Sequence, residues 1–452
     1  MKTMKRVAAV ALSVVVLMTS GVSAKAAVTD VQPAKSSSEA VLKWAKKVGE
    51  PFDEKTYANN TVSKIKLVGN YLYVADDAKH RIMKIDKKDG TILKEQKYCD
   101  ESYIQGYVSS IGYGDGKVYV GYDNGRVQAF DENTLESLWI TDENKNAINS
   151  DFVFTNGKLY FGTTAKTTDW YDNGAPFSYY VVTTSDDDKT KPDEEKTMKK
   201  VVESKTGKFY LKKGVVLGKY IVISDTAGTL TMIDTTNDKV TDTKDIGEAF
   251  SGNITYDEMT GTIYFVAGTN DLYGIKVSAD GKLKDEKKVR LYETGYSSTT
   301  PEVYNGKVYV SGSKGKAFQD KGYMAVADVS SDKYKVNYTV ELSNYSQCEP
   351  TIVKTGENSV RVYFTINDEP GGIYAIEDSK DATSATLEKV YEPTGDIKNT
   401  GCMSDVVVDE DGTIYFANDS KYIMSVGKKV EDTKKPVTKT VKSTRSVKLT
   451  WK

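Results

Sequence analysis

Histidine and cysteine are scarce in this chain, and their scarcity excludes several kinds of chemistry. The 452 residues include one histidine, His80, which rules out a His-rich zinc site and leaves a Ser or Cys nucleophile a single imidazole as its base. We interpret His80 as a solvated residue of a hairpin turn. Three cysteines in so long a chain cannot form the disulfide scaffold of a small secreted domain, so the fold must depend on a hydrophobic core.

Arginine is also rare, and the chain has almost no net charge. Only six residues are arginine, and 62 basic against 64 acidic residues leave a formal charge of −2. With so little net charge, the chain has no electrostatic field that would attract nucleic acid or an anionic membrane. Because arginine is the residue suited to bidentate phosphate contacts, the lysine-dominated surface indicates solubilising cover and no nucleic-acid partner.

Long hydrophobic runs are absent except near the start of the chain. Basic residues 2, 5 and 6 precede an uncharged apolar run over residues 7–18, and small residues follow up to Ala26. This pattern predicts a signal peptide over residues 1–26, because the run is shorter than the ~20 residues that a membrane-spanning helix needs. We therefore expect a secreted or cell-surface protein with no membrane insertion after cleavage, in a compartment that permits disulfides.

A short strand-like motif centred on tyrosine recurs eight times along the chain. From Tyr73 to Tyr415, seven steps cover 342 residues, a mean of about 49, which is typical of propeller blades. The eight copies are residues 70–74, 116–120, 157–161, 218–222, 261–265, 306–310, 360–364 and 412–416.

Each repeat carries the same order of strand patterns around this motif. One apolar strand precedes the tyrosine strand, another follows a polar turn, and a more polar fourth strand closes the unit, as in residues 135–140 and 336–342. Inner strands that are apolar on both faces suit blades packed between neighbours, while the outermost strand meets solvent. The sequence therefore predicts an all-β fold, a single eight-bladed β-propeller of four-stranded blades.

The eighth unit has only three strands, and the N-terminal region supplies the missing one. Residues 40–49 contain a Leu-x-Trp pattern at Trp44 that is similar to the fourth strand around Trp139. We expect this strand to pair with the last unit and close the ring. The predicted domains are a linker over 27–39, the propeller over 40–430, and over 431–452 a linker and the truncated start of a fibronectin type III-like domain, within a longer polypeptide.

The segment Ala129–Trp139, with a weaker copy over 85–94, resembles the Ala-x-Asp-x-x-Thr-Gly-x-x-x-Trp repeat of pyrroloquinoline-quinone (PQQ)-type propellers. The whole of residues 44–427 looks like the exported PQQ-like (quinoprotein-like) propellers of Gram-positive anaerobes. The resemblance implies the fold, but this superfamily includes quinone-dependent dehydrogenases as well as assembly scaffolds.

A quinoprotein dehydrogenase would resemble its family in a vicinal disulfide, a tryptophan stacked on the cofactor and a bound calcium. Here the cysteines, Cys99, Cys348 and Cys402, are far apart, and Trp170 alone is a stacking candidate. We therefore expect no enzymatic activity and neither PQQ nor calcium as cofactor. The alternative is a PQQ- or calcium-dependent oxidoreductase of the quinoprotein type.

Turns that follow the tyrosine strands are rich in carboxylates, which are the ligands that calcium prefers. Asp123, Asp172, Asp271 and Asp368 are the calcium candidates, although Asp and Asn are also what tight hairpin turns require, and we favour that interpretation.

Two long insertions occur in turns of the same kind. Residues 163–178 contain Trp170, Tyr171 and Phe177, and residues 311–321 contain Phe318. Aromatic loops on a rigid scaffold suit the binding of a peptide or sugar, but these side chains could equally fold back and seal the blade edge.

Cys348 and Cys402 each stand just before the first strand of adjacent units, so a disulfide between them and two separate buried thiols are both open. The function we predict is non-enzymatic: an extracellular binding or scaffolding propeller, monomeric within a longer chain, that recognises a protein, peptide or glycan through one face of the ring.

Overall fold

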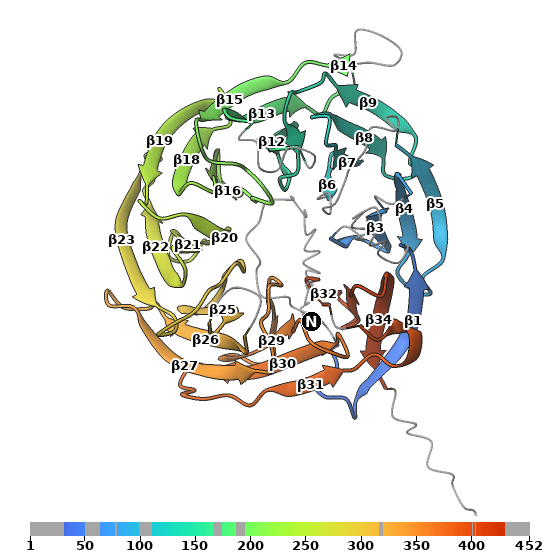
Figure 1. Ribbon diagram of the computed structural model, residues 1–452, viewed down its shortest axis with the longest axis vertical. Helices are drawn as coiled ribbons and strands as arrows, with labels where there is room; N and C mark the ends of the chain where they lie inside the picture. Colours follow the sequence, from blue (N-terminus) through green and yellow to red (C-terminus); the bar gives the residue numbers. More distant parts are fainter. Residues whose placement is uncertain are drawn as a thin grey trace, which may run out of the picture.

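Eight sheets surround a common axis in the computed structural model of this chain (Figure 1). The structure describes residues 31–49, 64–76, 79–98, 111–166, 174–186, 195–315, 320–399, 401–402 and 404–429. Within these ranges the secondary structure is strand, apart from one short 3-10 helix at Gly395–Ile397. The protein is an eight-bladed β-propeller, as the repeat predicted. No helix of the described part is long and apolar enough to cross a membrane.

Blades 1 to 7 contain four strands in chain order from the ring axis outward, and blade 8 takes its outermost strand from the N-terminal part of the chain. Blades 1 to 4 are β2 (Lys66–Val68), β3 (Tyr71–Asp76), β4 (Arg81–Asp86), β5 (Ile92–Lys97); β6 (Ile111–Gly114), β7 (Lys117–Gly121), β8 (Val127–Asp131), β9 (Ser137–Thr141); β11 (Val153–Thr155), β12 (Lys158–Thr164), β13 (Phe177–Thr183), β15 (Lys199–Ser204); β16 (Val215–Leu217), β17 (Tyr220–Ser224), β18 (Thr229–Asp234), β19 (Lys239–Asp245).

Blades 5 to 8 follow the same plan. They are β20 (Phe250–Asp257), β21 (Thr262–Ala267), β22 (Asp271–Val277), β23 (Leu283–Arg290); β24 (Glu302–Tyr304), β25 (Lys307–Ser313), β26 (Gly322–Asp328), β27 (Lys335–Leu342); β28 (Thr351–Lys354), β29 (Ser359–Thr365), β30 (Ile373–Ser379), β31 (Glu388–Tyr391); β32 (Val407–Val408), β33 (Ile414–Ala417), β34 (Tyr422–Lys428) and β1 (Ala40–Lys47). Two short additions, β10 (Ala147–Ile148) and β14 (Glu195–Lys196), extend blades 3 and 2.

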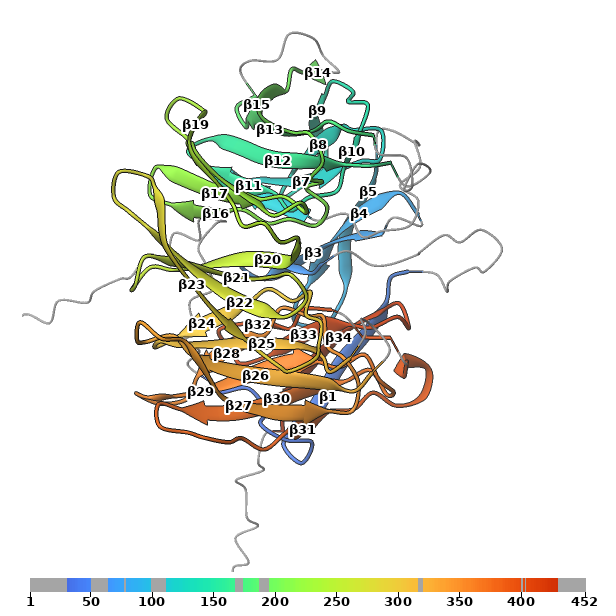
Figure 2. The ribbon, with the colours of Figure 1, turned by 60° about the vertical axis from the view of Figure 1, so that its left-hand side comes forward.

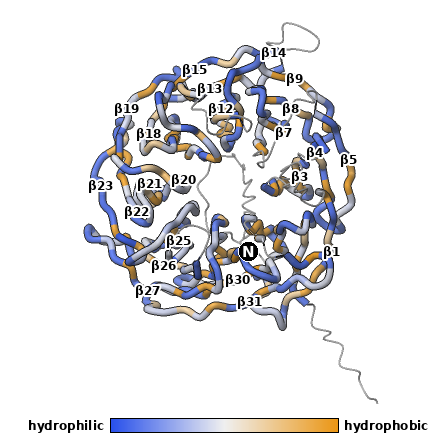
Figure 3. Tube along the Cα trace, in the orientation of Figure 1, coloured by the Kyte–Doolittle hydropathy of each residue, from blue (hydrophilic) through white to orange (hydrophobic). Residues whose placement is uncertain are grey.

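The hydrophobic core lies between the blades. The second and third strands are buried on both faces, as in β25, where all seven residues are buried, because each blade is sandwiched between two others. Outer strands such as β5, β19 and β23 alternate polar and half-buried residues and appear mostly blue in Figure 3. Figure 2 shows β19, β23 and β27 along the outer surface of the ring.

The N-terminal strand closes the ring. β1 pairs antiparallel with β34, with Trp44 opposite Ser425, which confirms the predicted closure. The Trp44 indole donates a hydrogen bond to Lys87 O at 3.0 Å. Residues 31–39, which we had assigned to the linker, also pack against the propeller: Ala34 is buried and its carbonyl accepts a hydrogen bond of 3.1 Å from Tyr363 Oη in blade 7.

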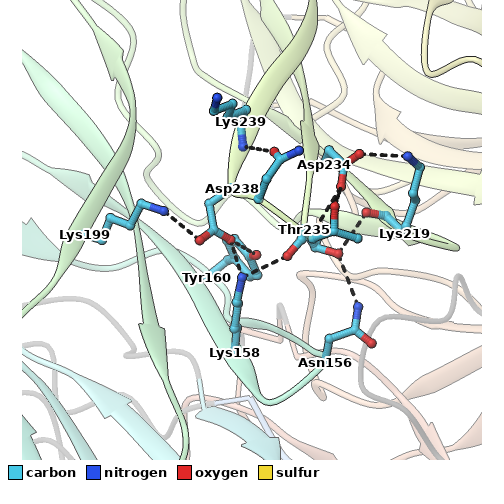
Figure 4. Close-up of polar contacts among 11 residues, drawn as sticks. Asn156, Lys158, Tyr160, Lys199, Lys219, Asp234, Thr235, Asp238 and Lys239 are labelled. Carbon is cyan, nitrogen blue, oxygen red and sulfur yellow. Dashed lines mark hydrogen bonds and ion pairs between the residues drawn. The ribbon is translucent and has the colours of Figure 1, made fainter. Parts of the chain in front are cut away.

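The repeated Gly-Lys-x-Tyr sequence has a structural reason: its lysine and tyrosine hold the next blade. In blade 3, Lys158 Nζ and Tyr160 Oη reach Asp238 Oδ1 of blade 4 at 2.8 and 2.7 Å (Figure 4). Burial alone would raise the pKa of Asp238, but hydrogen bonds from Lys158, Lys199 and Tyr160 hold it below its ordinary value.

The same clamp recurs in blade 6 and is more deeply buried there. Lys307 Nζ lies 3.0 Å from Asp378 Oδ2 of blade 7, and Tyr309 Oη and Tyr338 Oη reach the same carboxylate at 2.7 and 2.5 Å. The lysine and aspartate side chains are 8% and 1% exposed. These two clamps fix blade 3 to blade 4 and blade 6 to blade 7, on the face where the first and second strands connect.

Candidate binding site at the ring axis

Charged residues gather where the innermost strands begin. Register places Lys66, Val153, Thr351 and Val407 opposite the tyrosines of their blades, and charged groups occupy the positions two residues earlier in the chain. We call the following residues the axial cluster: Lys64, Lys66, Asp151, Lys213, Glu302, Glu349 and Asp405.

Ion pairs, two of which join non-adjacent blades, show that these side chains converge at the ring axis. Lys213 Nζ of blade 4 lies 3.4 Å from Glu349 Oε1 of blade 7. Lys64 Nζ of blade 1 lies 3.2 Å from Asp405 Oδ2 of blade 8 and 3.8 Å from Asp151 Oδ2 of blade 3. Blades 4 and 7 can meet only across the centre of the ring, where the first strand of each blade lies innermost in Figure 1. The backbone joins in as well, since Glu349 N donates to Asp405 Oδ1 at 2.7 Å.

The side chains of the axial cluster differ in their solvent exposure. The Lys64 and Lys213 side chains are 41% and 34% exposed, and those of Asp405 and Glu349 are 24% and 17% exposed. Glu302, the first residue of β24, is only 1% exposed. Glu302 therefore lies at the base of the cluster, beneath groups that reach solvent.

Burial and neighbouring charges shift the pKa values of the carboxyl groups in opposite directions. Burial acts to raise the pKa of Glu349, but the Lys213 and Lys64 ammoniums outweigh it and lower the pKa to about 2. The pKa of Glu302 is raised well above its ordinary value, first by burial and then by the Glu349 charge, with Lys213 opposing. Burial also raises the pKa of Asp405. The pKa values of this pair are therefore shifted apart, upward for Glu302 and downward for Glu349.

The Glu302 carboxyl group is paired with that of Glu349, and no amide, hydroxyl or ammonium donor of the described residues reaches its oxygens. Replacing buried charges by apolar side chains is often neutral or stabilising. The axial cluster is therefore not explained by the stability of the fold.

The long insertions open on the same face as the axial cluster. In a four-stranded antiparallel blade, the entry to the first strand and the turn between the second and third lie at one end. The insertions between β12 and β13 and between β25 and β26 are turns of this second kind. Of their aromatics, Trp170, Tyr171 and Phe318 lie outside the described residues.

Phe177 does not lie on the surface of its insertion. It begins β13, is 1% exposed, and packs in the core with Tyr179 and Phe209. A ligand at the face cannot contact this side chain, so for Phe177 the structure gives the alternative that we considered, an aromatic that seals the blade.

The calcium candidates do not come together. Asp123 and Asp368 lie in turns of blades 2 and 7, and Asp271 is paired with the Arg290 guanidinium of β23, while Asp172 lies outside the described residues. Within the described ranges, no three His, Cys, Asp or Glu side chains are grouped as a metal site would need. His80 lies in the β3–β4 turn, as expected, with φ at 50°.

The disulfide that we considered between Cys348 and Cys402 is absent, and both are buried free thiols. Their places in the two blades are not equivalent. Cys348 Sγ accepts a hydrogen bond of 3.1 Å from Thr365 N, and in blade 8 it is Ser404 Oγ that accepts one from the corresponding Ala417 N. Cys402 stands two residues earlier and contacts Ala417 O at 3.5 Å. Cys348 packs in the core between blades 6 and 7, and Cys402 packs in the core between blades 7 and 8.

Comparison with known proteins gives the fold and no closer relation. No family model matches the chain, and no curated protein matches it. Among solved structures, it is similar to BamB from Moraxella catarrhalis, with 12% identity, a TM-score of 0.57, and coverage of 86% of this chain and 97% of that one. It is also similar to the quinohemoprotein alcohol dehydrogenase from Comamonas testosteroni, with 11% identity, a TM-score of 0.60, and coverage of 88% and 78%.

A second quinohemoprotein alcohol dehydrogenase, ADHIIG from Pseudomonas putida HK5, gives a TM-score of 0.58 at 11% identity, with the same coverage of 88% and 78%. The chain therefore has a β-propeller fold that is similar to the folds of these proteins. At these identities the likeness establishes the architecture alone, because one fold serves unrelated functions.

The described residues at the axis do not fit a quinone held with calcium. Lys64, Lys66 and Lys213 interleave with the carboxylates, so their ammoniums occupy the surroundings that a calcium ion would need. Trp44 and Trp139 lie on the outermost strands β1 and β9, away from the axis, and the described cysteines are separate thiols.

Proposed function

We propose that this protein is a non-enzymatic, exported propeller that binds a protein, peptide or glycan through the face carrying the axial cluster. The observation that supports this proposal best is the convergence of seven charged side chains from six blades at the ring axis, with Glu302 buried at their base. Ionised groups that do not serve stability suit recognition, since charge complementarity gives specificity to an interface. They favour a protein or peptide partner over a neutral glycan.

Localisation at the cell surface or outside it belongs to the same proposal. Its support is the signal-peptide pattern of residues 1–26, which lie outside the described part of the chain. The protein acts as a monomer, and the ring presents one face to its partner. It needs neither PQQ nor calcium.

A PQQ- or calcium-dependent oxidoreductase is the second candidate, and the fold shared with quinohemoprotein alcohol dehydrogenases favours it. An absorbance spectrum and a dye-linked assay separate the two functions. We expect purified protein to show only protein absorbance, and no oxidation of alcohols or sugars after PQQ and calcium are added. Oxidation together with micromolar binding of PQQ would establish the oxidoreductase instead.

Selection from a displayed peptide library and from a glycan array tests the binding face. Ligands selected on the wild-type protein should bind the Lys64→Met variant at least tenfold more weakly. The matched control is Lys219→Met. Lys219 lies in the β16–β17 turn on the opposite face, and its exposed ammonium is paired with Asp234. The control should bind as the wild type does. Ligands that bind both variants equally, or no ligand from either source, would contradict the proposal.

A further inference from the structure

The outermost strand of blade 7 pairs with only part of the third strand. β31 is paired with β30 over residues 373–375 alone. Lys380 N donates to Asn358 O at 3.0 Å, so the even-numbered residues of β30 bond inward to β29, and Glu377 directs its N–H and C=O outward. By register Thr386 would pair with Glu377, but no main-chain hydrogen bond joins the two within the described range 320–399.

Blade 7 differs in this respect from blades 1 to 6. In each of those blades the residue that corresponds to Glu377 is paired with the outermost strand. The six pairs are Lys84–Lys94, Ala129–Trp139, Val181–Lys199, Met232–Asp242, Gly274–Lys287 and Val326–Tyr338. Glu377 therefore leaves an open strand edge, of the kind to which an extended peptide can add.

A pocket of about 560 Å³ lies beside this open edge. Its walls are residues 375–377 of β30, residues 384–388 of the outer segment and residues 35–36 of the N-terminal segment. This volume is typical of sites that hold small ligands. Ala375 and Glu388 both line the pocket and pair with each other, so the pocket is closed at the end where β31 rejoins β30. A strand that enters along β30 must stop there, as the end of a chain does.

Arg361 of β29 supplies the positive charge of this pocket that is best shielded from solvent. Its side chain is 10% exposed, whereas that of Glu377 is 60% exposed and Glu388 is exposed. Arg361 Nη2 donates to Glu377 Oε2 at 2.7 Å, and the Tyr363 hydroxyl is a second partner. A guanidinium has five N–H donors, so further donors remain for a ligand. Water screens the exposed carboxylates more than it screens Arg361, which therefore favours a carboxylate over an ammonium.

The blade clamps show what this position binds elsewhere in the ring. In blades 3 and 6 the clamp lysine binds an aspartate of the next blade, as Lys307 binds Asp378. Arg361 stands at the corresponding position of blade 7. Tyr363 of the same motif donates to a carbonyl of the N-terminal segment, and no carboxylate of the described part of blade 8 is paired with Arg361. A ligand carboxylate would supply the group that the next blade supplies in the clamps.

We propose that the blade 7 pocket binds the C-terminal end of an extended peptide, which adds as a strand to β30 and places its terminal carboxylate against Arg361. The strand runs antiparallel to β30, because its last residue lies at the closed end. Its main chain bonds to Glu377, and the hydroxyl groups of Ser384 and Thr386 line the other wall. This site is separate from the axial cluster, and the inference goes beyond the proposed function.

Affinity selection from a library of acetylated hexapeptides with free carboxyl ends tests the proposal. Each selected peptide is made again as its C-terminal carboxamide and, separately, with two glycines added after the terminus. In titration calorimetry both changes should weaken binding at least tenfold. Hydrogen–deuterium exchange should show protection at Glu377 in the complex. Failure to select any peptide, or equal affinity for the carboxamide, would overturn the inference.

Two variants and a control locate the site. Arg361→Gln should weaken binding at least tenfold. Ser384→Trp fills the pocket from an exposed position, so it should abolish binding and leave Tm unchanged. Lys389→Gln removes an exposed ammonium of β31 outside the pocket and should bind as the wild type does. Unchanged affinity in Ser384→Trp would overturn the inference. Peptides displayed with their C-termini joined to a carrier cannot occupy this pocket, so the test of the axial face and this test fail independently.

Discussion

The buried clamp between blades 6 and 7 should be among the most sensitive points of the ring. Asp378 receives hydrogen bonds from Lys307, Tyr309 and Tyr338, and both members of its ion pair are more than nine-tenths buried. The substitution Asp378→Asn keeps the shape of the side chain but removes its charge. The Lys307 ammonium is then buried without compensation, which costs about 3–5 kcal/mol of the free energy of unfolding.

The corresponding change in melting temperature follows from the size of the propeller. The unfolding entropy is about 0.8 kcal/mol/K for the roughly 390 residues between Ala40 and Lys428, so Tm should fall by about 4–6 °C, measured by scanning calorimetry. The matched control is Asp332→Asn, whose carboxylate is fully exposed beside Lys287 and should not change Tm.

A double variant decides whether the uncompensated charge is the cause. Lys307→Met combined with Asp378→Asn removes both charges and should recover most of the lost stability, because the neutral pair leaves no buried ion. A single variant that melts with the wild type would refute the clamp as a stabilising contact. A double variant no more stable than the single one would refute the electrostatic explanation.

Three further predictions address ring closure, the thiols and the axial acid. Trp44→Ala should lower the unfolding free energy by about 3 kcal/mol in denaturant titrations, because the indole packs 6.1 Å from the Tyr415 ring and closes blade 8; an unchanged midpoint would contradict the closure. Cys348 and Cys402 should both be alkylated in denatured protein that has not been reduced, and a peptide map that finds them joined by a disulfide would contradict this. In the folded protein burial raises the pKa of both thiols, so their alkylation at pH 8 should be slow. Folding raises the pKa of Glu302, so its contribution to stability is present below the pKa of the unfolded chain and is lost as the pH rises through the pKa of the folded protein. The Tm of Glu302→Gln relative to wild type should therefore increase from pH 5 to pH 8. A constant difference would contradict the raised pKa.

The architecture was predictable because it depends on a local pattern that repeats. The tyrosine strand and its polar fourth strand recur at a nearly constant spacing, and one surplus strand at Trp44 completes the eighth unit. The Gly-Lys-x-Tyr sequence was visible too, but its role was not. Recognising that Lys158 and Tyr160 bind Asp238 requires the position of the following blade.

The axial cluster could not be predicted from single repeats, because it depends on which residues of distant blades share one level. Lys213 and Glu349 are 136 positions apart and meet across the ring. The sequence does contain a signal, a charged residue just ahead of the first strand in several repeats, but the candidate ligands that we predicted all lie in the turns between second and third strands. The same dependence on register explains the cysteines, since Cys348 corresponds to Ser404 and not to Cys402.

Hydrogen–deuterium exchange with and without a library-selected ligand tests most directly whether the axial face is the binding face. The account predicts that amides become protected where the inner strands begin, at residues 64–68, 213–217, 302–304 and 349–354. Turns between the first and second strands, such as residues 218–219 and 355–358, should exchange as before. Protection of those turns or of the outer strands, with the starts of the inner strands unchanged, would contradict it.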